Sequence, residues 1–434
     1  ETQEQREDII WHVCRENKDC FLGSMVEAQL EIYGTALYKQ KRMLHRKNVQ
    51  NFMQALNLPD GRSREQEKNK KRIVIVAEQL LSIKHAPTLI TLEFAYILQE
   101  KMNYEVCIIT CPLDYHLPFD LWVDPRYYYG GFEGVRDIPY KGVKIRNIGF
   151  SMEDGSLDRC SRMLHMIAAW KPWLVLELGV TNPLADLCRE FTATVAMAMT
   201  TECPVSEADI LIRYVPGTGA YEEACKKELL PRQKQIFMQE KLPVIAQEAE
   251  KECVPDELGL PEGKFFVAVV GNRLDLEIDE AFLNIMKQIM DAAENVDFAV
   301  IGDAEKLQEK LADTSYGKRI HFLGYCMDLP GTYRALHLYL NPRRLGGGWS
   351  SAMALMAGLP VVTLPACDVA YNVGGEFTVT TEEEMVDAVI RYASDDVFYA
   401  QKKQIAIEKG RDGGEQKMLE YVTSLFTRIQ ENVE

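Results

Sequence analysis

Short apolar runs that alternate with helical patterns constrain the fold of this chain more than any other feature. Residues 72–77 read RIVIVA, a second run, YEVCIITC, spans 104–111, and a helical pattern over 88–102 separates them. Uninterrupted runs rich in β-branched residues are typical of strands buried on both faces of a sheet. Their alternation with helices predicts parallel strands joined by right-handed crossovers, which is the α/β class.

The same alternation continues along the chain in two halves. Further strands are predicted over 141–148, 173–179, 265–273, 296–302, 318–325, 336–342 and 359–364. A stretch rich in Pro, Glu and Gly, 242–264, separates the halves and fits a hinge connection. We therefore expect two Rossmann-like, doubly wound domains, and because ligands of such sheets bind at the carboxyl ends of the strands, we expect the domains to face a cleft.

Four segments follow from this pattern. Residues 1–70 are polar and form a helical N-terminal extension, 71–250 form the first Rossmann-like domain, and 251–405 form the second. Residues 406–434 form a C-terminal helix that can cross back to the first domain.

The charge of the chain argues against nucleic acid as a partner, and one basic segment allows two interpretations. The chain of 434 residues carries 49 basic and 65 acidic side chains, a net charge of −16, which argues against general nucleic-acid binding. Residues 39–72 hold eleven Lys and Arg against three acids, a local balance of +8. This block is either a solvated helical face or a contact with an anionic membrane surface.

The sequence points to a cytoplasmic protein. It has no apolar stretch long enough to span a membrane, and its first ten residues have no signal-peptide core. Its eleven cysteines have no C-x-x-C spacing, so we expect reduced thiols and neither a zinc site nor a disulfide framework. If the basic block contacts lipid, the protein would be peripheral at the inner membrane face.

The strongest chemical signal lies within LNPRRLGGGWSSAMALMAGLPVVTL, residues 340–364, which reads strand, loop, helix, strand. Three glycines let the backbone approach a ligand, and the helix starting near Ser350 directs its free N–H groups and positive dipole end into the loop. Arg343 and Arg344 add guanidinium groups that match phosphate oxygens. We expect a pyrophosphate cradle. The spacing fits neither the P-loop nor G-x-G-x-x-G, which disfavours an NTPase or a dehydrogenase.

This motif carries a resemblance to a known family. Strand, N-P-x-R, G-G-G-x-S, helix and A-G-L-P-V-V-T resemble the nucleotide-sugar half of GT-B fold glycosyltransferases, the group 1 enzymes related to glycogen synthase and sucrose synthase. The resemblance covers residues 262–400 well and implies the GT-B fold. VVGNRLD, 269–275, resembles the family's G-x-R element and implies that Arg273 meets the donor diphosphate. The segment 321–342 resembles the nucleobase pocket and places Gly324 and Tyr325 against the base.

Glycine loop and resemblance together predict the donor site. The residues expected at the diphosphate are Arg273, Arg343, Arg344, Gly346, Gly347, Gly348, Ser350 and Ser351. Those expected at sugar hydroxyls are Asp368 and Glu376, after the last strand, and Thr181 and Asn182, in a turn where helix capping is an equal alternative. One position departs from the family: Met353 stands where many members have an acid that binds the donor ribose, and Glu376 is a candidate substitute.

In the first half the candidate catalytic residue is His85. It lies in the loop after the first strand, before a helix that starts near Thr88, and its HAPT sequence resembles the acceptor-side loop of some bacterial GT-B enzymes. An imidazole there is placed to take a proton from an acceptor or to donate to the donor phosphate. Aromatic residues at Trp122 and 127–129 are further candidates for acceptor contacts.

The resulting prediction is a bacterial glycosyltransferase. It would move a hexose or N-acetylhexosamine from a nucleotide-diphosphate sugar, most simply UDP-linked, to a glycan, lipid-linked or protein acceptor. With no D-x-D element at a strand end, we expect no metal and no cofactor beyond the donor. The alternatives are a non-catalytic GT-B partner or chaperone of another glycosyltransferase, which Met353 favours, and a nucleotide-sugar epimerase on the same fold.

Overall fold

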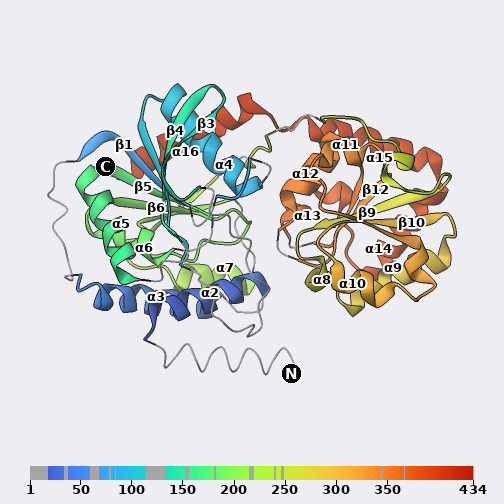
Figure 1. Ribbon diagram of the computed structural model, residues 1–434, viewed down its shortest axis with the longest axis horizontal. Coiled ribbons are helices and arrows are strands. Elements are labelled where there is room, and N and C mark those ends of the chain that lie inside the picture. Colours follow the sequence, from blue (N-terminus) through green and yellow to red (C-terminus); the bar gives the residue numbers. More distant parts are fainter. Residues whose placement is uncertain are drawn as a thin grey trace. The chain divides into compact units, whose positions relative to one another are not determined.

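The computed structural model divides into two compact units, Glu1–Glu240 with Tyr421–Glu434, and Lys241–Glu420 (Figure 1). The boundary lies ten residues before the predicted one at 250, and the described N-terminal helices, within residues 18–58, belong to unit 1. The structure describes residues 18–33, 38–58, 68–77, 80–83, 85–113, 132–151, 156–179, 182–214, 219–238, 241–245, 249–344, 346–365 and 367–433. Trp122, residues 127–129 and Thr181 lie outside these ranges.

Unit 1 is built on one eight-stranded sheet with the order β3-β4-β2-β1-β5-β6-β7-β8. Its strands are β1 (Asn69–Ala77), β2 (Glu105–Thr110), β3 (Gly134–Tyr140), β4 (Val143–Gly149), β5 (Pro172–Leu178), β6 (Ala193–Met197), β7 (Ile210–Arg213) and β8 (Lys234–Phe237). Its helices are α2 (Cys20–Tyr33), α3 (Tyr38–Ala55), α4 (Ala86–Tyr96) with a π-helical continuation η1 (Ile97–Lys101), α5 (Leu157–Trp170), α6 (Pro183–Leu187), the 3₁₀ turn η3 (Cys188–Glu190) and α7 (Gly219–Lys227).

Unit 2 has a five-stranded, wholly parallel sheet with the order β11-β10-β9-β12-β13. Its strands are β9 (Phe265–Gly271), β10 (Val296–Gly302), β11 (Ile320–Gly324), β12 (Leu338–Leu340) and β13 (Val361–Val362). Its longer helices are α9 (Glu280–Ala292), α10 (Glu305–Leu311), α12 (Gly348–Met356), α14 (Glu382–Ser394) and α15 (Asp396–Gly410). Short elements are η4 (Pro255–Leu258), α8 (Leu274–Glu277), η5 (Tyr316–Arg319), α11 (Leu329–Tyr333), α13 (Asp368–Val373) and η6 (Gly375–Phe377).

The predicted fold class, two parallel-sheet α/β domains with N-terminal helices, is confirmed, with one local exception. The strand predicted over 141–148 is the second arm of a hairpin, because β3 pairs antiparallel with β4. Lys141 and Gly142 form the turn with φ of 45° and 80°, and two positive φ values are the requirement of a type I′ hairpin turn. The first sheet is therefore mixed.

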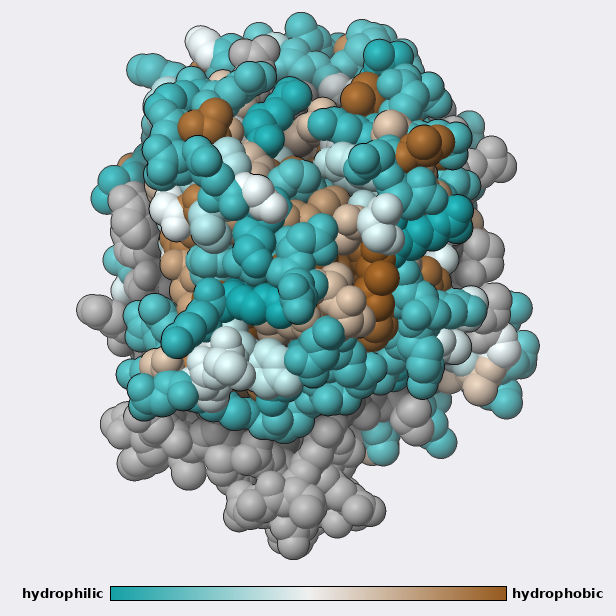
Figure 2. Space-filling view, turned by 90° about the vertical axis from the view of Figure 1, so that its right-hand side faces the viewer, coloured by the Kyte–Doolittle hydropathy of each residue, from teal (hydrophilic) through white to brown (hydrophobic). Residues whose placement is uncertain are grey.

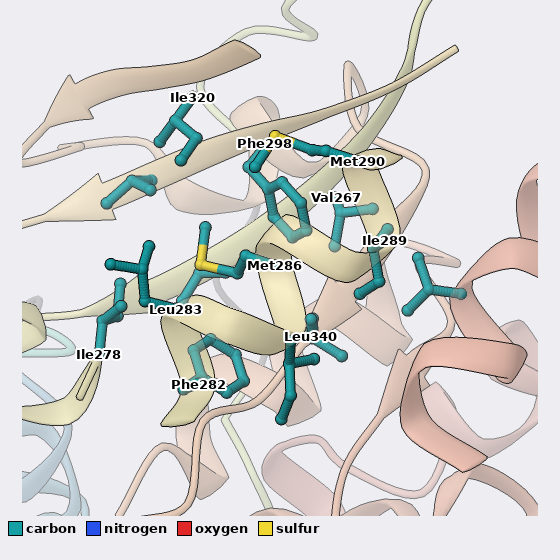
Figure 3. Close-up of a cluster of buried hydrophobic side chains, with 14 of the residues drawn as sticks. Val267, Ile278, Phe282, Leu283, Met286, Ile289, Met290, Phe298, Ile320 and Leu340 are labelled. Atoms are coloured by element: carbon teal, nitrogen blue, oxygen red, sulfur yellow. The ribbon is translucent and has the colours of Figure 1, made fainter. Parts of the chain in front are cut away.

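Helix α9 shows how unit 2 gathers its core. The Asp279 carboxylate caps the helix by accepting from the Phe282 amide over 2.8 Å. The apolar face of α9 packs against the strands, so that Met286 and Phe298 of β10 share one buried cluster (Figure 3). The side of the molecule in Figure 2 is mostly hydrophilic, with small separate apolar areas. Burial of Met286, Phe298 and the other side chains of this core cluster, and not a helix-forming sequence alone, holds α9 in place.

The basic block is partly folded into unit 1. Lys41 Nζ lies 3.0 Å from Glu202 Oε2, and Arg46 Nη1 lies 3.1 Å from Glu228 Oε2. The fully buried Arg42 donates to the Ser206 carbonyl and, over 2.9 Å, to Gln233 Oε1. For Lys41 and Arg42 the reading of a solvated face is wrong, because both side chains are buried against acceptors of unit 1. No described helix is both long and apolar enough to cross a membrane.

A buried imidazole joins the N-terminal helices to the first sheet. His45 of α3 lies between Glu27 of α2, at 2.7 Å, and Asp186 of α6, which its Nε2 also contacts. Burial alone would lower the pKa of His45, but the carboxylates of Glu27 and Asp186 raise it to about 10. His45 is therefore a cation at neutral pH, and Asp186 also accepts from the Ser206 hydroxyl over 2.6 Å.

Replacing His45 by Gln should strongly destabilise unit 1. The change leaves two buried carboxylates without their cation, a loss of about 3–5 kcal/mol in the free energy of unfolding. Urea unfolding measures it, with His165→Gln as the control because His165 is exposed.

The contribution of His45 to the free energy of unfolding should fall as the pH rises. The folded-state pKa of His45 lies above its unfolded value, so the stabilisation is fully present below about pH 6.5 and is lost as the pH rises toward about 10. The stability difference between wild type and His45→Gln should therefore shrink over that range. A difference that stays constant from pH 6 to pH 10 would contradict the charged imidazole.

Candidate functional site

The predicted glycine loop joins β12 to α12 and needs glycine for two reasons. Gly346 and Gly347 have φ of 90° and 78°, in the left-handed region that other residues rarely adopt. A Cβ on Gly347 would also lie 2.7 Å from Arg344 Nη2, and one on Gly348 would lie 2.5 Å from Asn372 Nδ2. The loop is therefore packed tightly against side chains of unit 2.

Helix α12 begins at the end of this loop, with Gly347 as its N-cap. The Ser351 amide donates to the Gly347 carbonyl over 3.0 Å, which is the first turn's helical bond. Amides of the first helical residues, from Gly348 to Ser350, come before that bond and have no acceptor within the helix. The end of α12 thus presents N–H groups and the positive dipole end, an arrangement suited to an anion.

Asp368 fixes the entrance of the loop. Its Oδ2 accepts from the Gly346 amide over 2.9 Å, and the side chain is buried at the start of α13. The Gly346 amide is therefore used inside the protein. This contact gives Asp368 a part in shaping the loop, whereas the sequence placed it at sugar hydroxyls.

Arg344 is a buried structural group. Its side chain is 5% exposed; Nη1 is paired with Glu277 Oε2, and Nη2 donates to the Val270 carbonyl over 2.6 Å and to the Tyr339 hydroxyl over 2.9 Å. Its Nε donates to Asn341 Oδ1 over 3.0 Å. Burial lowers the pKa of Arg344, but Tyr339 and Glu277 raise it above its usual range, so the guanidinium stays charged.

Arg273 lies beside the glycine loop and has a partly exposed side chain. The side chain is 39% exposed, its Nη2 is 3.1 Å from Glu277 Oε1, and the same nitrogen would be 3.9 Å from a Cβ on Gly346. One carboxylate thus holds both guanidiniums, with Oε1 toward Arg273 and Oε2 toward Arg344. Glu277 was not among the residues predicted from the sequence, although its position four residues after Arg273, one helical turn away, was a usable signal.

Arg343 has a different environment from Arg344. Its side chain is 80% exposed and lies 3.7 Å from Glu382 Oε1 at the start of α14. Arg343 and Arg344 were both predicted to bind the diphosphate, but Arg343 is exposed and Arg344 is buried.

The two serines mainly serve the helix. The Ser350 hydroxyl donates to the Gly347 carbonyl over 3.0 Å and lies 3.1 Å from the Tyr339 hydroxyl. Ser351 is fully buried, and its hydroxyl donates to the Gly348 carbonyl over 2.9 Å. The Ser351 side chain is thus enclosed, whereas its amide closes the first turn.

The remaining predicted residues of unit 2 have separate surroundings. Tyr325, directly after Gly324 (φ 65°) at the end of β11, is 62% exposed. Glu376 is paired with Lys402 at 2.6 Å, and this hydrogen bond lowers the Glu376 pKa. Met353 is buried in an apolar cluster on α12, so it packs as methionine usually does.

In unit 1 the structure describes His85 and Asn182. His85 is the N-cap residue of α4 and its Nδ1 lies 2.9 Å from the Thr88 hydroxyl. Burial lowers the pKa of His85 to about 4, so its imidazole is neutral at pH 7. Asn182 is buried, and its Oδ1 caps α6 by accepting from the Leu184 amide over 3.0 Å. Of the two roles that the sequence left open for Asn182, sugar binding and helix capping, the structure shows capping.

Within the described ranges, no three His, Cys, Asp or Glu side chains are grouped so as to hold a metal ion. The candidate site of unit 2 therefore consists of the first turn of α12, the glycine loop, Arg273 and the Glu277–Arg344 pair behind them. Chemically it combines the N–H groups at the start of α12 with the partly exposed guanidinium of Arg273, an arrangement that suits an anion.

Comparisons with known proteins concern the family and the fold. Residues 266–395 match the family described as Glycosyl transferases group 1. No curated protein matches the chain. Among solved structures, a mutant O-GlcNAc transferase of Thermobaculum terrenum is similar at a TM-score of 0.66 and 15% identity, covering 95% of this chain and 78% of that one.

Two further structures have nucleotide-containing ligands. HepE of Anabaena in complex with UDP and glucose has a TM-score of 0.55 at 12% identity, and 82% of this chain and 100% of that one are covered. A trehalose-6-phosphate structure from E. coli, bound with UDP-2-fluoro glucose, has a TM-score of 0.57 at 10% identity, with 84% and 99% covered. The chain has the GT-B fold of glycosyltransferases. The residues that match the group 1 glycosyltransferase family, 266–395, lie within its second unit, and this match indicates a glycosyltransferase.

The different burial of the two neighbouring arginines gives a direct test. Arg344→Ala should lower the free energy of unfolding by about 3–5 kcal/mol, because Glu277 loses its buried partner. Arg343→Ala should change it by no more than about 0.5 kcal/mol, as exposed substitutions usually do. Urea unfolding of both variants measures this, and equal effects would refute the structural role of Arg344.

Proposed function

We propose that this chain transfers a hexosyl or N-acetylhexosaminyl group from a nucleotide-diphosphate sugar, UDP-linked in the simplest case, to a glycan, lipid-linked or protein acceptor. The observation that carries the proposal is the position of Arg273 beside the glycine loop, next to the first turn of α12, inside a group 1 glycosyltransferase domain. UDP is favoured because two similar structures contain UDP or a UDP sugar.

The mechanism follows from where charge develops. In the transfer, the bond between the anomeric carbon and the diphosphate oxygen breaks, and the acceptor forms a new bond to that carbon. Negative charge accumulates on the departing nucleotide diphosphate. Arg273 and the amides of Gly348 to Ser350 would stabilise this charge, and because they are already oriented they need little rearrangement. These fixed positive groups support a reaction without a metal ion.

The other residues that the sequence predicted for the site have revised roles in this proposal. Glu277 and Arg344 would act through Arg273 and the loop, as positioning residues, because Arg344 is enclosed by protein acceptors. We also propose that Gly324 and Tyr325 contact the nucleobase, because the exposed ring of Tyr325 can stack on a base. Asp368, through the loop, and Glu376, if released from Lys402, stay proposed near the sugar.

Nucleotide binding tests the diphosphate site. UDP or a UDP sugar at a hundred times its dissociation constant should stabilise the wild type by about 2.7 kcal/mol, seen as a higher melting temperature. Arg273→Ala should weaken binding at least about tenfold, since a hydrogen bond to a charged group contributes about 1.5–3 kcal/mol. Arg343→Ala is the matched control. No shift with uridine, guanosine or adenosine diphosphates and their sugars would overturn the proposal.

His85 should act as a neutral group. With a pKa of about 4 it is a weak base at pH 7, so its proposed part is a hydrogen bond to acceptor or donor. His85→Ala should lower kcat/KM about tenfold, which corresponds to one hydrogen bond of about 1.4 kcal/mol, by the same factor at pH 6 and pH 8. A factor that grows as the pH rises through 6.5 would instead identify a titrating base.

One observation favours a second candidate, a non-catalytic GT-B partner of another glycosyltransferase. Met353 is buried among apolar side chains at the position where the resemblance implies a ribose-binding acid. Incubation with labelled UDP sugars separates the candidates. Transfer or slow hydrolysis supports the enzyme, a new epimer formed without acceptor supports an epimerase, and binding without turnover supports the partner.

A further inference from the structure

A buried threonine lies against the imidazole of His85, the side chain to which the proposed transfer assigns a hydrogen bond. Thr88 follows His85 by three residues, in the first turn of α4, and its side chain is fully buried. The Thr88 hydroxyl oxygen is 2.9 Å from His85 Nδ1 and accepts from the Leu81 amide, also over 2.9 Å. Within the described ranges these are the two hydrogen bonds of this hydroxyl.

The hydroxyl hydrogen of Thr88 needs an acceptor because the group is buried. A hydroxyl has one hydrogen to donate and two lone pairs, and one lone pair of Thr88 already receives the Leu81 amide. A buried polar hydrogen without an acceptor is costly, so nearly all such hydrogens are paired in folded proteins. Among the described residues the remaining partner is His85 Nδ1, and Thr88 therefore donates to this nitrogen.

This hydrogen bond decides which nitrogen of the His85 ring carries the proton. Burial lowers the pKa of His85 to about 4, so the ring is neutral at pH 7. A neutral imidazole has one N–H group and, on the other nitrogen, one lone pair. When the lone pair of Nδ1 accepts from Thr88, the ring proton is on Nε2. In the part of the chain that the structure describes, Nε2 has no hydrogen-bond partner, and the side chain is partly exposed.

Backbone hydrogen bonds hold the loop around His85 in the same arrangement. The His85 amide donates to the Ser82 carbonyl over 3.0 Å, and the Leu89 amide donates to the His85 carbonyl over 2.9 Å. The contact between the Leu81 amide and Thr88 ties the start of this loop to α4. The ring is thus held through its backbone and through Nδ1, which is how a supporting residue orients a functional group.

We propose that Thr88 is a positioning residue that holds His85 as the Nε2–H tautomer, so that His85 donates a hydrogen bond to a substrate oxygen and does not remove a proton from it. A general base would need its lone pair on Nε2, the nitrogen that carries the proton in this arrangement. The oxygen belongs either to the donor diphosphate or to the acceptor, since both have lone pairs. This assignment rests on the proposed transfer, whereas the tautomer is a property of the protein without substrate.

The tautomer can be measured in the full-length chain by NMR. After labelling with 15N-histidine, long-range correlations between ring protons and nitrogens at pH 7 distinguish a protonated nitrogen from one with a lone pair. The chain has seven histidines, and the signals that are missing from His85→Gln belong to His85. We expect a protonated Nε2 and an unprotonated Nδ1. A proton on Nδ1, or rapid exchange between the two tautomers in the wild type, would overturn the proposal.

Two substitutions at Thr88 and one control test the cause of this tautomer. Thr88→Val removes the hydroxyl and should allow both tautomers, whereas Thr88→Ser retains a hydroxyl and should give the wild-type spectrum. Thr91→Val is the matched control, because the buried Thr91 also lies in α4 but donates to the Pro87 carbonyl over 2.8 Å. It should leave the His85 signals unchanged. Equal changes in both valine variants would contradict a specific role of Thr88, and the wild-type spectrum is informative even if Thr88→Val does not fold.

Turnover of a labelled UDP sugar tests what the tautomer does. Thr88→Val should lower kcat/KM by no more than the loss of about tenfold expected for His85→Ala. The double variant should lose no more than His85→Ala alone, because Thr88 acts through His85, and additive losses would overturn the positioning role. Weaker UDP binding by Thr88→Val would assign the oxygen to the diphosphate, and unchanged UDP binding with a lower kcat would assign it to the acceptor.

The two kinds of measurement separate this inference from the proposed function. A wild type that neither binds UDP nor turns over a UDP sugar contradicts the proposed function, while the NMR spectrum still decides whether Thr88 fixes the tautomer. Turnover together with an Nδ1–H tautomer supports the proposed function and overturns the inference.

Discussion

The carboxylate of Glu277, shared by two guanidiniums, is the interaction on which the candidate site of unit 2 depends. It keeps Arg344 charged inside the protein and turns Arg273 toward the glycine loop. Arg344 in turn contacts β9 through the Val270 carbonyl and β12 through Tyr339. A buried guanidinium without an opposite charge is costly, so the pair fixes the loop between two central strands of the sheet.

Unit 1 uses the same principle at a different place. There the buried cation is His45, and its two carboxylates come from α2 and α6. The polar N-terminal helices are held to the sheet by these charges as well as by apolar contacts. In both units, therefore, a buried cation between acidic or carbonyl groups fixes segments that are far apart in the sequence.

The sequence predicted the main elements because each long buried strand is an uninterrupted apolar run. It missed β3, β6, β7 and β8. Strand β3 is mostly exposed, β6 has five residues, and β7 and β8 have four each. The glycine loop was predictable from local geometry, since positive φ values need glycine. The role of Arg344 was not, because its partner Glu277 lies 67 residues earlier and only the folded sheet brings them together. The acidic partners of the basic block, Glu202 and Glu228, could not be predicted for the same reason, because they too are far away in the sequence.

Helix α16 (Glu415–Val433) has a consequence for how this chain can be divided. From Tyr421 onward it belongs to unit 1, where Gln430 Nε2 donates to the Tyr104 hydroxyl over 2.7 Å. Unit 1 is therefore discontinuous in sequence, and unit 2 is inserted into it. An expression fragment that stops near residue 240 would expose the surface beneath this helix. A chimera that exchanges only Lys241–Glu420 with a relative would keep both units whole.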